Sequence, residues 1–179
     1  MNLFFRMLWV IATALLSRRR LEPLDVSELT FRVLPNDLDV NLHINNGRYL
    51  TIADLGRIDM MLRTGMVRTL VRQRWAPILG GATVRFRRSL LPFQRYRLKT
   101  RLLCWDAKWV YMEHVFETMD GELAAVVWVK GLFKAGSRTV PTSDVLEAMG
   151  RHYDSPPMPP EVFAWQTAEQ AMAESARAA

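Results

Sequence analysis

One helical stretch followed by four strand-like runs restricts most strongly how this chain can fold. Residues 48–65 place apolar side chains at close to helical spacing and end in Gly65, a residue suited to closing a helix. The strand-like runs are residues 82–90, 96–106, 109–119 and 122–133. Short polar links, DAK and DGE, separate the last three and are typical of turns between antiparallel neighbours. We therefore expect the four strands to form a meander.

A further strand is expected before the long helix. Residues 28–34 alternate between apolar and polar side chains, with Leu29, Phe31 and Val33 on one side. A single long helix followed by such strands can hide its apolar face only by lying across the sheet. The order therefore predicts an α+β fold, and residues 66–75 add a shorter amphipathic segment.

Length and composition favour one folded domain with an extension at each end. A chain of 179 residues with 50% hydrophobic and 23% charged residues can bury a single core. We expect an apolar segment at 1–24, the folded domain at 25–140 and a C-terminal extension at 141–179. Prolines interrupt the extension, and its Ala- and Glu-rich end is expected to form a short helix or to fray.

The net charge and the small number of cysteine and histidine residues limit which ligands and partners the chain is expected to bind. The net charge of +6 comes mostly from arginine, which suits phosphates and carboxylates, although a solvated basic face would explain it equally well. No nucleic-acid-binding motif is present, so no nucleic acid partner is expected. Cys104 alone excludes an internal disulfide, and His43, His114 and His152 lack the spacing of a zinc site. We expect no cofactor, a reducing compartment, and a packed core position for His114.

The N-terminal segment is apolar from Leu3 to Leu16 except for Arg6 and ends in arginines at 18–20. It is shorter than the roughly 20 residues that span a bilayer, and it lacks the small residues of a signal cleavage site. Three alternatives remain: an interfacial helix, a short or tilted anchor, and a helix packed on its own domain. Its aromatic residues beside arginines favour membrane association. We expect a cytoplasmic protein, peripheral to the inner face of a membrane.

The sequence DLDVNLHINNGRY at 37–49 concentrates polar residues between the first strand and the long helix. Asp, Asn and Gly are common turn formers, so a polar loop is the simplest interpretation. Asp37 is expected to be a turn or cap residue, and Asn45 or Asn46 to cap the helix.

The strand, the DxDxxxHxNNxxY motif and the long helix before further strands together resemble the hot-dog thioesterases. The likeness is closest to the thioesterase superfamily member six type (4-hydroxybenzoyl-CoA thioesterase-like) proteins, and it extends from about Phe31 to Trp165, including RRSL at 87–90 and PPMPPEVFAW in the tail. It implies a hot-dog fold, an antiparallel sheet wrapped around one long central helix. It also implies a homodimer or homotetramer with each site at a subunit boundary.

The resemblance also implies where the chemistry lies. Thioester hydrolysis needs a nucleophile or an activated water, a group that polarises the carbonyl, and a slot for the acyl chain. Asp39 matches the carboxylate that attacks the thioester or acts as general base in many hot-dog thioesterases, and His43 can orient a water or stabilise the carbonyl oxygen. The expected catalytic residues are Asp39, His43 and Asn41. The expected substrate-binding residues are Asn45, Asn46, Gly47, Tyr49 and Ser89.

Two positions of this sequence differ from the motifs of related thioesterases. Residues 39–43 follow the D-x-N-x-H order of plant acyl-carrier-protein thioesterases, but Ser89 stands where those enzymes carry an acid after their RR pair. Leu42 replaces the small residue that precedes the histidine in many bacterial relatives. The expected function is hydrolysis of a fatty acyl-CoA or acyl-carrier-protein thioester. The alternatives are a non-catalytic, membrane-associated acyl or lipid-binding protein and, fitting less well because of its Asp–His spacing, an enoyl-CoA hydratase.

Overall fold

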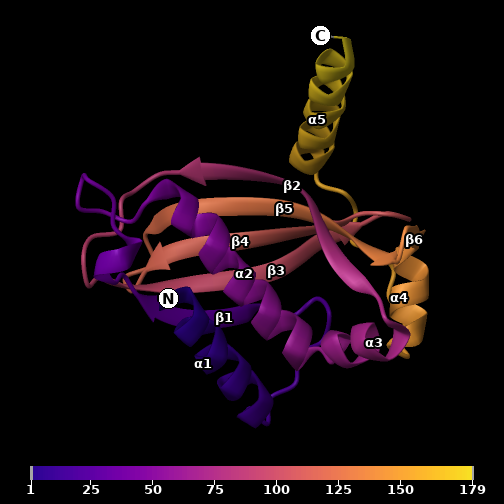
Figure 1. Cartoon of the computed structure of the whole chain (residues 1–179), viewed down its shortest axis with the longest axis horizontal. Coiled ribbons are helices and arrows are strands. Elements are labelled where there is room, and N and C mark those ends of the chain that lie inside the picture. Colours follow the sequence, from indigo (N-terminus) through magenta and orange to yellow (C-terminus); the bar gives the residue numbers. More distant parts are fainter. Residues whose placement is uncertain (1, 179) are drawn as a thin grey trace.

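A curved antiparallel sheet lies against one long helix, α2 (Figure 1). The computed structural model describes residues 2–178. Its elements are α1 (Asn2–Leu16), β1 (Ser27–Arg32), the 3-10 turn η1 (Pro35–Asp37), α2 (Asn46–Arg63), α3 (Met66–Gln73), β2 (Ala76–Phe86), β3 (Arg95–Trp105), β4 (Val110–Thr118), β5 (Leu123–Ala135), β6 (Arg138–Val140), α4 (Thr142–Ala148) and α5 (Pro160–Ala178). The predicted α+β class is confirmed.

The strand order is β1-β3-β4-β5-β2, with β6 paired to β5. The predicted meander is correct for β3, β4 and β5 but wrong for β2, which pairs with β5 instead of β3. The helix α2 carries the chain from β1 at one edge to the opposite edge, where β2 forms. Residues 87–94 then cross back to β3, which lies between the edge strand β1 and β4. The strand also begins at Ala76, earlier than predicted, and a bulge between Leu79 and Gly81 interrupts its alternation.

Close packing holds α2 on the centre of the sheet. Tyr49, Ile52 and Ala53 are buried on the helix face that contacts the main core. At Gly56 a Cβ atom would lie 2.2 Å from Oγ1 of Thr100 on β3. Glycine at this position therefore allows the helix to approach the sheet closely.

The N-terminal helix α1 packs beside α2 by one face (Figure 1). Val10 and Ala14 are fully buried in that contact. The opposite face leaves Phe5, Trp9 and Leu16 exposed. In the described part of the chain, no helix combines the length and apolar character that crossing a bilayer requires. The helix therefore packs on its own domain and still presents a second apolar surface outward.

The C-terminal extension begins with α4, which the sequence pattern does not predict, and ends with the expected helix, α5. Val162 and Trp165 of α5 pack with Cys104 and Tyr111 on the outer face of the sheet. Glu169 still pairs with Lys130 of β5, and beyond it α5 projects away from the sheet (Figure 1). Burial raises the pKa of the Cys104 thiol to about 11, which keeps this cysteine protonated and unreactive at neutral pH.

Candidate functional site

The central part of the predicted site is a tight loop, residues 39–43. An isolated antiparallel β-bridge between Leu38 and Ile44 closes this loop. The Asp39 N–H donates to the His43 carbonyl at 3.0 Å, and the Leu42 N–H donates to the Asp39 carbonyl at 3.1 Å. Leu42 has φ +57°, a left-handed conformation that few non-glycine residues adopt. These bonds fix the loop so that its first and last polar side chains face each other.

The loop brings two predicted catalytic residues together. Oδ1 of Asp39 lies 3.6 Å from Nδ1 of His43, and both side chains are partly exposed. The same Oδ1 accepts a hydrogen bond from the Asn41 N–H at 2.8 Å. Asn41 thus orients the carboxylate through its backbone, while its side chain is exposed to solvent. Within residues 2–178, no group of three or more His, Cys, Asp or Glu side chains is arranged to hold a metal ion.

The start of α2 is capped by Asn45. Its side-chain oxygen accepts from the Gly47 N–H at 2.9 Å, and its own N–H donates to the Asp37 carbonyl at 2.8 Å. Of the two candidate caps, the structure therefore selects Asn45, and Asn46 becomes the first helical residue, exposed like Gly47. The first-turn amides of α2 point towards the loop side of the helix, where their partial positive charge favours an anion.

Tyr49 supports the loop from within the core. Its ring lies edge-on to the rings of Phe86 and Phe116, with centroids 5.3 and 4.9 Å apart. Burial raises the pKa of its hydroxyl to about 12, opposed by a hydrogen bond to the Leu90 backbone. The Leu90 carbonyl also accepts from the Ile44 N–H at 3.0 Å. Tyr49 is therefore a packed core residue, and its predicted contact with a substrate stays a prediction.

Ser89 is exposed on the link that leaves β2. Its neighbour Leu90 is bound to Ile44, so the chain at Ser89 runs beside the loop. The preceding arginine, Arg88, forms an ion pair with Glu122 on the turn before β5. The structure therefore keeps Ser89 near the other predicted residues, and its role in substrate binding stays a prediction.

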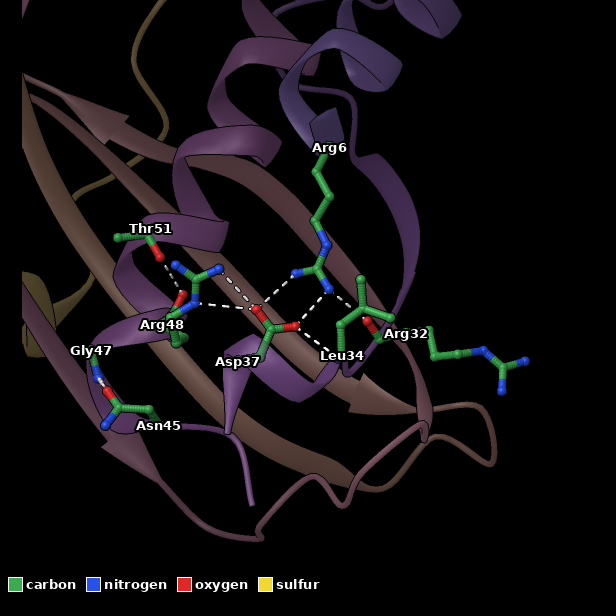
Figure 2. Close-up of polar contacts among 8 residues, drawn as sticks. All are labelled: Arg6, Arg32, Leu34, Asp37, Asn45, Gly47, Arg48 and Thr51. Carbon is green, nitrogen blue, oxygen red and sulfur yellow. Dashed lines mark hydrogen bonds and ion pairs between the residues drawn. The ribbon is translucent and has the colours of Figure 1, made fainter. Parts of the chain in front are cut away.

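Asp37 is the hub of the polar contacts behind the loop (Figure 2). Its side chain is fully buried and accepts from Arg6 at 2.6 Å, from Arg48 at 2.8 Å and from the Leu34 N–H at 2.9 Å. The bond to Leu34 confirms the predicted capping role. Sequence reasoning missed the two arginines. The signal for Arg6 was its isolated charge within an apolar run, since such a charge needs a buried partner if the run packs.

A second buried polar group crosses the middle of the helix–sheet interface. His114, which is fully buried, has Nδ1 2.9 Å from Oγ1 of Thr100 and Nε2 3.3 Å from Nη1 of Arg57. Burial and the nearby Arg57 lower the pKa of His114 to about 3, so the imidazole is neutral at pH 7. Neutral Nε2 then accepts from Arg57, and Nδ1–H donates to Thr100. The predicted packed position of His114 is confirmed, whereas the Arg57 contact was missed.

An apolar cavity of about 640 Å³ lies under the second half of α2. Its walls come from both layers of the fold and are rich in methionine, a flexible side chain that adapts to varied apolar ligands. The lining methionines are Met7, Met60, Met61, Met66, Met112 and Met149. Asp39 and His43 are not among its lining residues. In a single chain, the polar loop and the cavity therefore occupy different places along α2.

Residues 33–166 match the sequence model of the Thioesterase-like superfamily, and this range includes both the loop and most of the cavity walls. The chain belongs to this superfamily.

The chain is similar to proteins from animals and fungi. It is 35% identical over 133 residues to Protein THEM6 of Xenopus laevis, covering 74% of this chain and 63% of that protein. Protein THEM6 of Drosophila melanogaster is 28% identical over 169 residues, covering 92% of this chain and 84% of that protein. A probable thioesterase of Saccharomyces cerevisiae is 29% identical over 119 residues, covering 65% of this chain and 51% of that protein. The chain thus spans less than two thirds of the Xenopus relative.

Solved structures of proteins named as thioesterases share the fold. YbaW, a probable thioesterase from Escherichia coli, has a TM-score of 0.63 at 18% identity, covering 68% of this chain and 97% of that chain. BH1999, a gentisyl-coenzyme A thioesterase, has a TM-score of 0.61 at 19% identity, covering 68% of this chain and 99% of that chain. The expected hot-dog fold is confirmed by these likenesses.

Proposed function

We propose that this protein is a thioester hydrolase that cleaves a fatty acyl thioester of coenzyme A or of acyl carrier protein into free acid and thiol. The observation that carries the proposal is the pairing of Asp39 with His43 at the N-terminal end of α2. Both side chains are partly exposed, so a substrate can reach them.

The chemistry follows from the position of the carboxylate. Asp39 either attacks the thioester carbonyl carbon, giving an anhydride that water then hydrolyses, or takes a proton from an attacking water that His43 is positioned to orient. Charge then develops on the carbonyl oxygen, which the first-turn amides of α2 and their helix dipole stabilise. In both routes the C–S bond breaks, and the leaving thiolate takes up a proton to become the free thiol. Asn45 contributes by fixing where those amides begin, because its side chain caps the helix.

Formation of a homodimer, alone or as half of a homotetramer, would bring the loop of one copy next to the apolar cavity of the other. The edge strand β2 leaves nine of its 11 residues exposed, which suits pairing with a second copy. Its first part, residues 77–79, lines the cavity, and its last residue, Phe86, leads to the loop-bound Leu90. Antiparallel pairing about a twofold axis would set the start of one β2 beside the end of the other. Asp39 of one copy would then face the acyl cavity of its partner.

Peripheral attachment to the inner face of a membrane is the second part of the proposal. The outer face of α1 exposes Phe4, Phe5 and Trp9, and the arginines at 18–20 follow its end. Apolar side chains with adjacent cations favour the interface of an anionic bilayer. This placement would put a long-chain substrate close to Phe4, which also lines the cavity.

Release of thiol from a panel of acyl-CoA and acyl-carrier-protein substrates tests the hydrolase proposal. We expect the wild-type protein to release thiol and Asp39→Asn to lose that activity while keeping the same circular dichroism spectrum and unfolding midpoint. Asp120→Asn, at an exposed turn far along the chain, is the matched control and should keep full activity. Absence of release across the whole panel, or full activity in Asp39→Asn, would contradict the proposal.

A non-catalytic acyl-binding protein is the second candidate. It is favoured by Ser89, which stands where an acid follows the RR pair in the plant enzymes that the loop resembles. Native mass spectrometry distinguishes the two, because this candidate predicts intact acyl-CoA bound to the protein with no accumulation of free thiol over time.

A further inference from the structure

Arginine side chains gather around the corner where α2 meets α3. Two adjoining hollows of about 530 and 330 Å³ lie there and share Thr64, Gly65, Arg68 and Arg151. We call them together the arginine groove. Its arginines are Arg20, Arg63, Arg68, Arg72 and Arg151. Among the described residues that line it, none is Asp or Glu.

The groove carries more positive charge than its neighbours neutralise. Asp59 pairs with Arg63 at 3.3 Å, and Glu22 pairs with Arg151 at 2.8 Å. These two acids, which are not among the lining residues, hold two of the groove's arginines in place. Arg68 is exposed, and it lines both hollows. An anion in the groove would therefore meet several preorganised guanidinium groups, the arrangement that best suits a phosphate.

The arginine groove shares lining residues with apolar surface on two sides. Thr64 lines both of its hollows and also the 640 Å³ apolar cavity. Met149 lines the cavity and the smaller hollow, while Leu15, Leu62 and other apolar side chains line the larger one. A ligand with a charged head and an apolar chain would satisfy both surfaces at once.

The arginine groove and the proposed catalytic loop lie at opposite ends of α2. The 18 residues of α2 span about 27 Å at 1.5 Å per residue, with the loop before its first residue and Thr64 after its last. The exposed end of α1, at Leu15 and Leu16, lies instead beside the groove, since Leu15 is one of its lining residues. The groove therefore adjoins the surface that we propose to rest on a membrane.

We propose that the arginine groove binds the phosphate headgroup of an anionic lipid, with the lipid chain reaching past Thr64 into the apolar cavity. The headgroup site uses none of the residues proposed for hydrolysis. The choice of a lipid source rests on the proposed membrane attachment, so the experiment uses a dispersed single-chain probe that requires neither a bilayer nor turnover.

Isothermal titration calorimetry with dodecyl phosphate below its micelle concentration tests the proposal on the full chain. Inorganic phosphate and free coenzyme A serve as comparison ligands. The test variant is Arg68→Gln/Arg72→Gln, which removes two exposed groove cations. Its matched control is Arg138→Gln/Arg177→Gln, which removes two exposed cations outside the groove. If the double test variant loses stability, Arg68→Gln alone replaces it.

We expect dodecyl phosphate to bind the wild type and the control alike, at least about tenfold more tightly than inorganic phosphate because the chain enters the cavity. The test variant should bind it about tenfold or more weakly. Equal affinity for inorganic phosphate, displacement by free coenzyme A, or unchanged binding in the test variant would each overturn the proposal. Binding with no thiol release in the activity assay would support this site while contradicting the hydrolase function.

Discussion

Arg6 of α1 and Asp37 of η1 form a buried ion pair, with Nη2 2.6 Å from Oδ2 (Figure 2). Arg48 in the first turn of α2 holds the other oxygen of the same carboxylate. The N-terminal helix and the start of the central helix are therefore joined through one residue. That residue lies two positions before Asp39, so the ion pair also fixes the base of the proposed catalytic loop.

Loss of the shared carboxylate should destabilise the protein strongly. Asp37→Ala leaves two arginines without their buried partner, and we expect it to lower the free energy of unfolding by about 3–5 kcal/mol. Arg6→Met should cost less, because Arg48 still pairs with Asp37. Urea unfolding measures both. The exposed pair of Arg88 and Glu122 gives the control, since Arg88→Gln should cost about 0–1 kcal/mol. Equal costs at the buried and exposed pairs would refute this account.

Stability should depend on pH through His114. Its pKa is about 3 when folded and 6.5 ordinarily, so between these values the unfolded chain binds a proton that the folded chain does not. Its contribution is complete above pH 6.5 and should fall by up to about 1.4 kcal/mol per pH unit as the pH drops towards 3. His114→Gln removes this titration. Unfolding curves from pH 4.5 to 7 should therefore have a smaller pH slope in the variant, and equal slopes would show that His114 does not titrate this way.

The approach of α2 to β3 should leave no room at Gly56. Gly56→Ala puts a methyl group 2.2 Å from Oγ1 of Thr100, and we expect a loss of about 1–3 kcal/mol in unfolding free energy. Adding Thr100→Ala removes that oxygen. The two substitutions together should then cost less than the sum of their separate costs, which a double-mutant cycle measures. Simple additivity would mean that the helix shifts instead of clashing.

The exposed edge of β2 should carry the contact between copies. Leu79→Lys puts a charge on this edge, and we expect light scattering after gel filtration to show a shift from dimer towards monomer. Val71→Lys makes the same change at an exposed apolar residue of α3 and should leave the mass unchanged. A wild-type monomer at micromolar concentration, or a dimer that persists in Leu79→Lys, would exclude pairing through this strand.

Local patterns were enough to predict most elements of the fold. Alternation identified β1 and the strands β3 to β5, and helical spacing identified α2 with its end near Gly65. Asn45 was one of two candidate caps, because an amide side chain just before a helix satisfies its free N–H groups. His114 was placed in the core by its apolar neighbours on the strand. Each of these inferences depends on residues close together in the chain.

The features that were missed depend on long-range contacts. The pairing of β2 with β5 follows from where α2 delivers the chain, and the bulge at Gly81 hides the strand pattern locally. The partners of Asp37 and His114 come from other elements, with Arg6 31 residues from Asp37 and Arg57 57 residues from His114. A single sequence shows that a charge needs a buried partner but does not identify which residue supplies it.

The packing of α1 has a practical consequence for anyone shortening the chain. An apolar amino-terminal helix is an obvious segment to remove before purification. A version that starts near residue 21 would lose Arg6 together with the exposed aromatic residues Phe4, Phe5 and Trp9. It would also uncover Phe31, against which Trp9 now lies with ring centroids 5.9 Å apart. Weak turnover by such a trimmed protein would then reflect the loss of the Arg6 contact to Asp37 and a loosened loop as much as the loss of the exposed aromatic face. Substitutions of those aromatic residues in the intact chain separate the two effects, because they leave Arg6 in place.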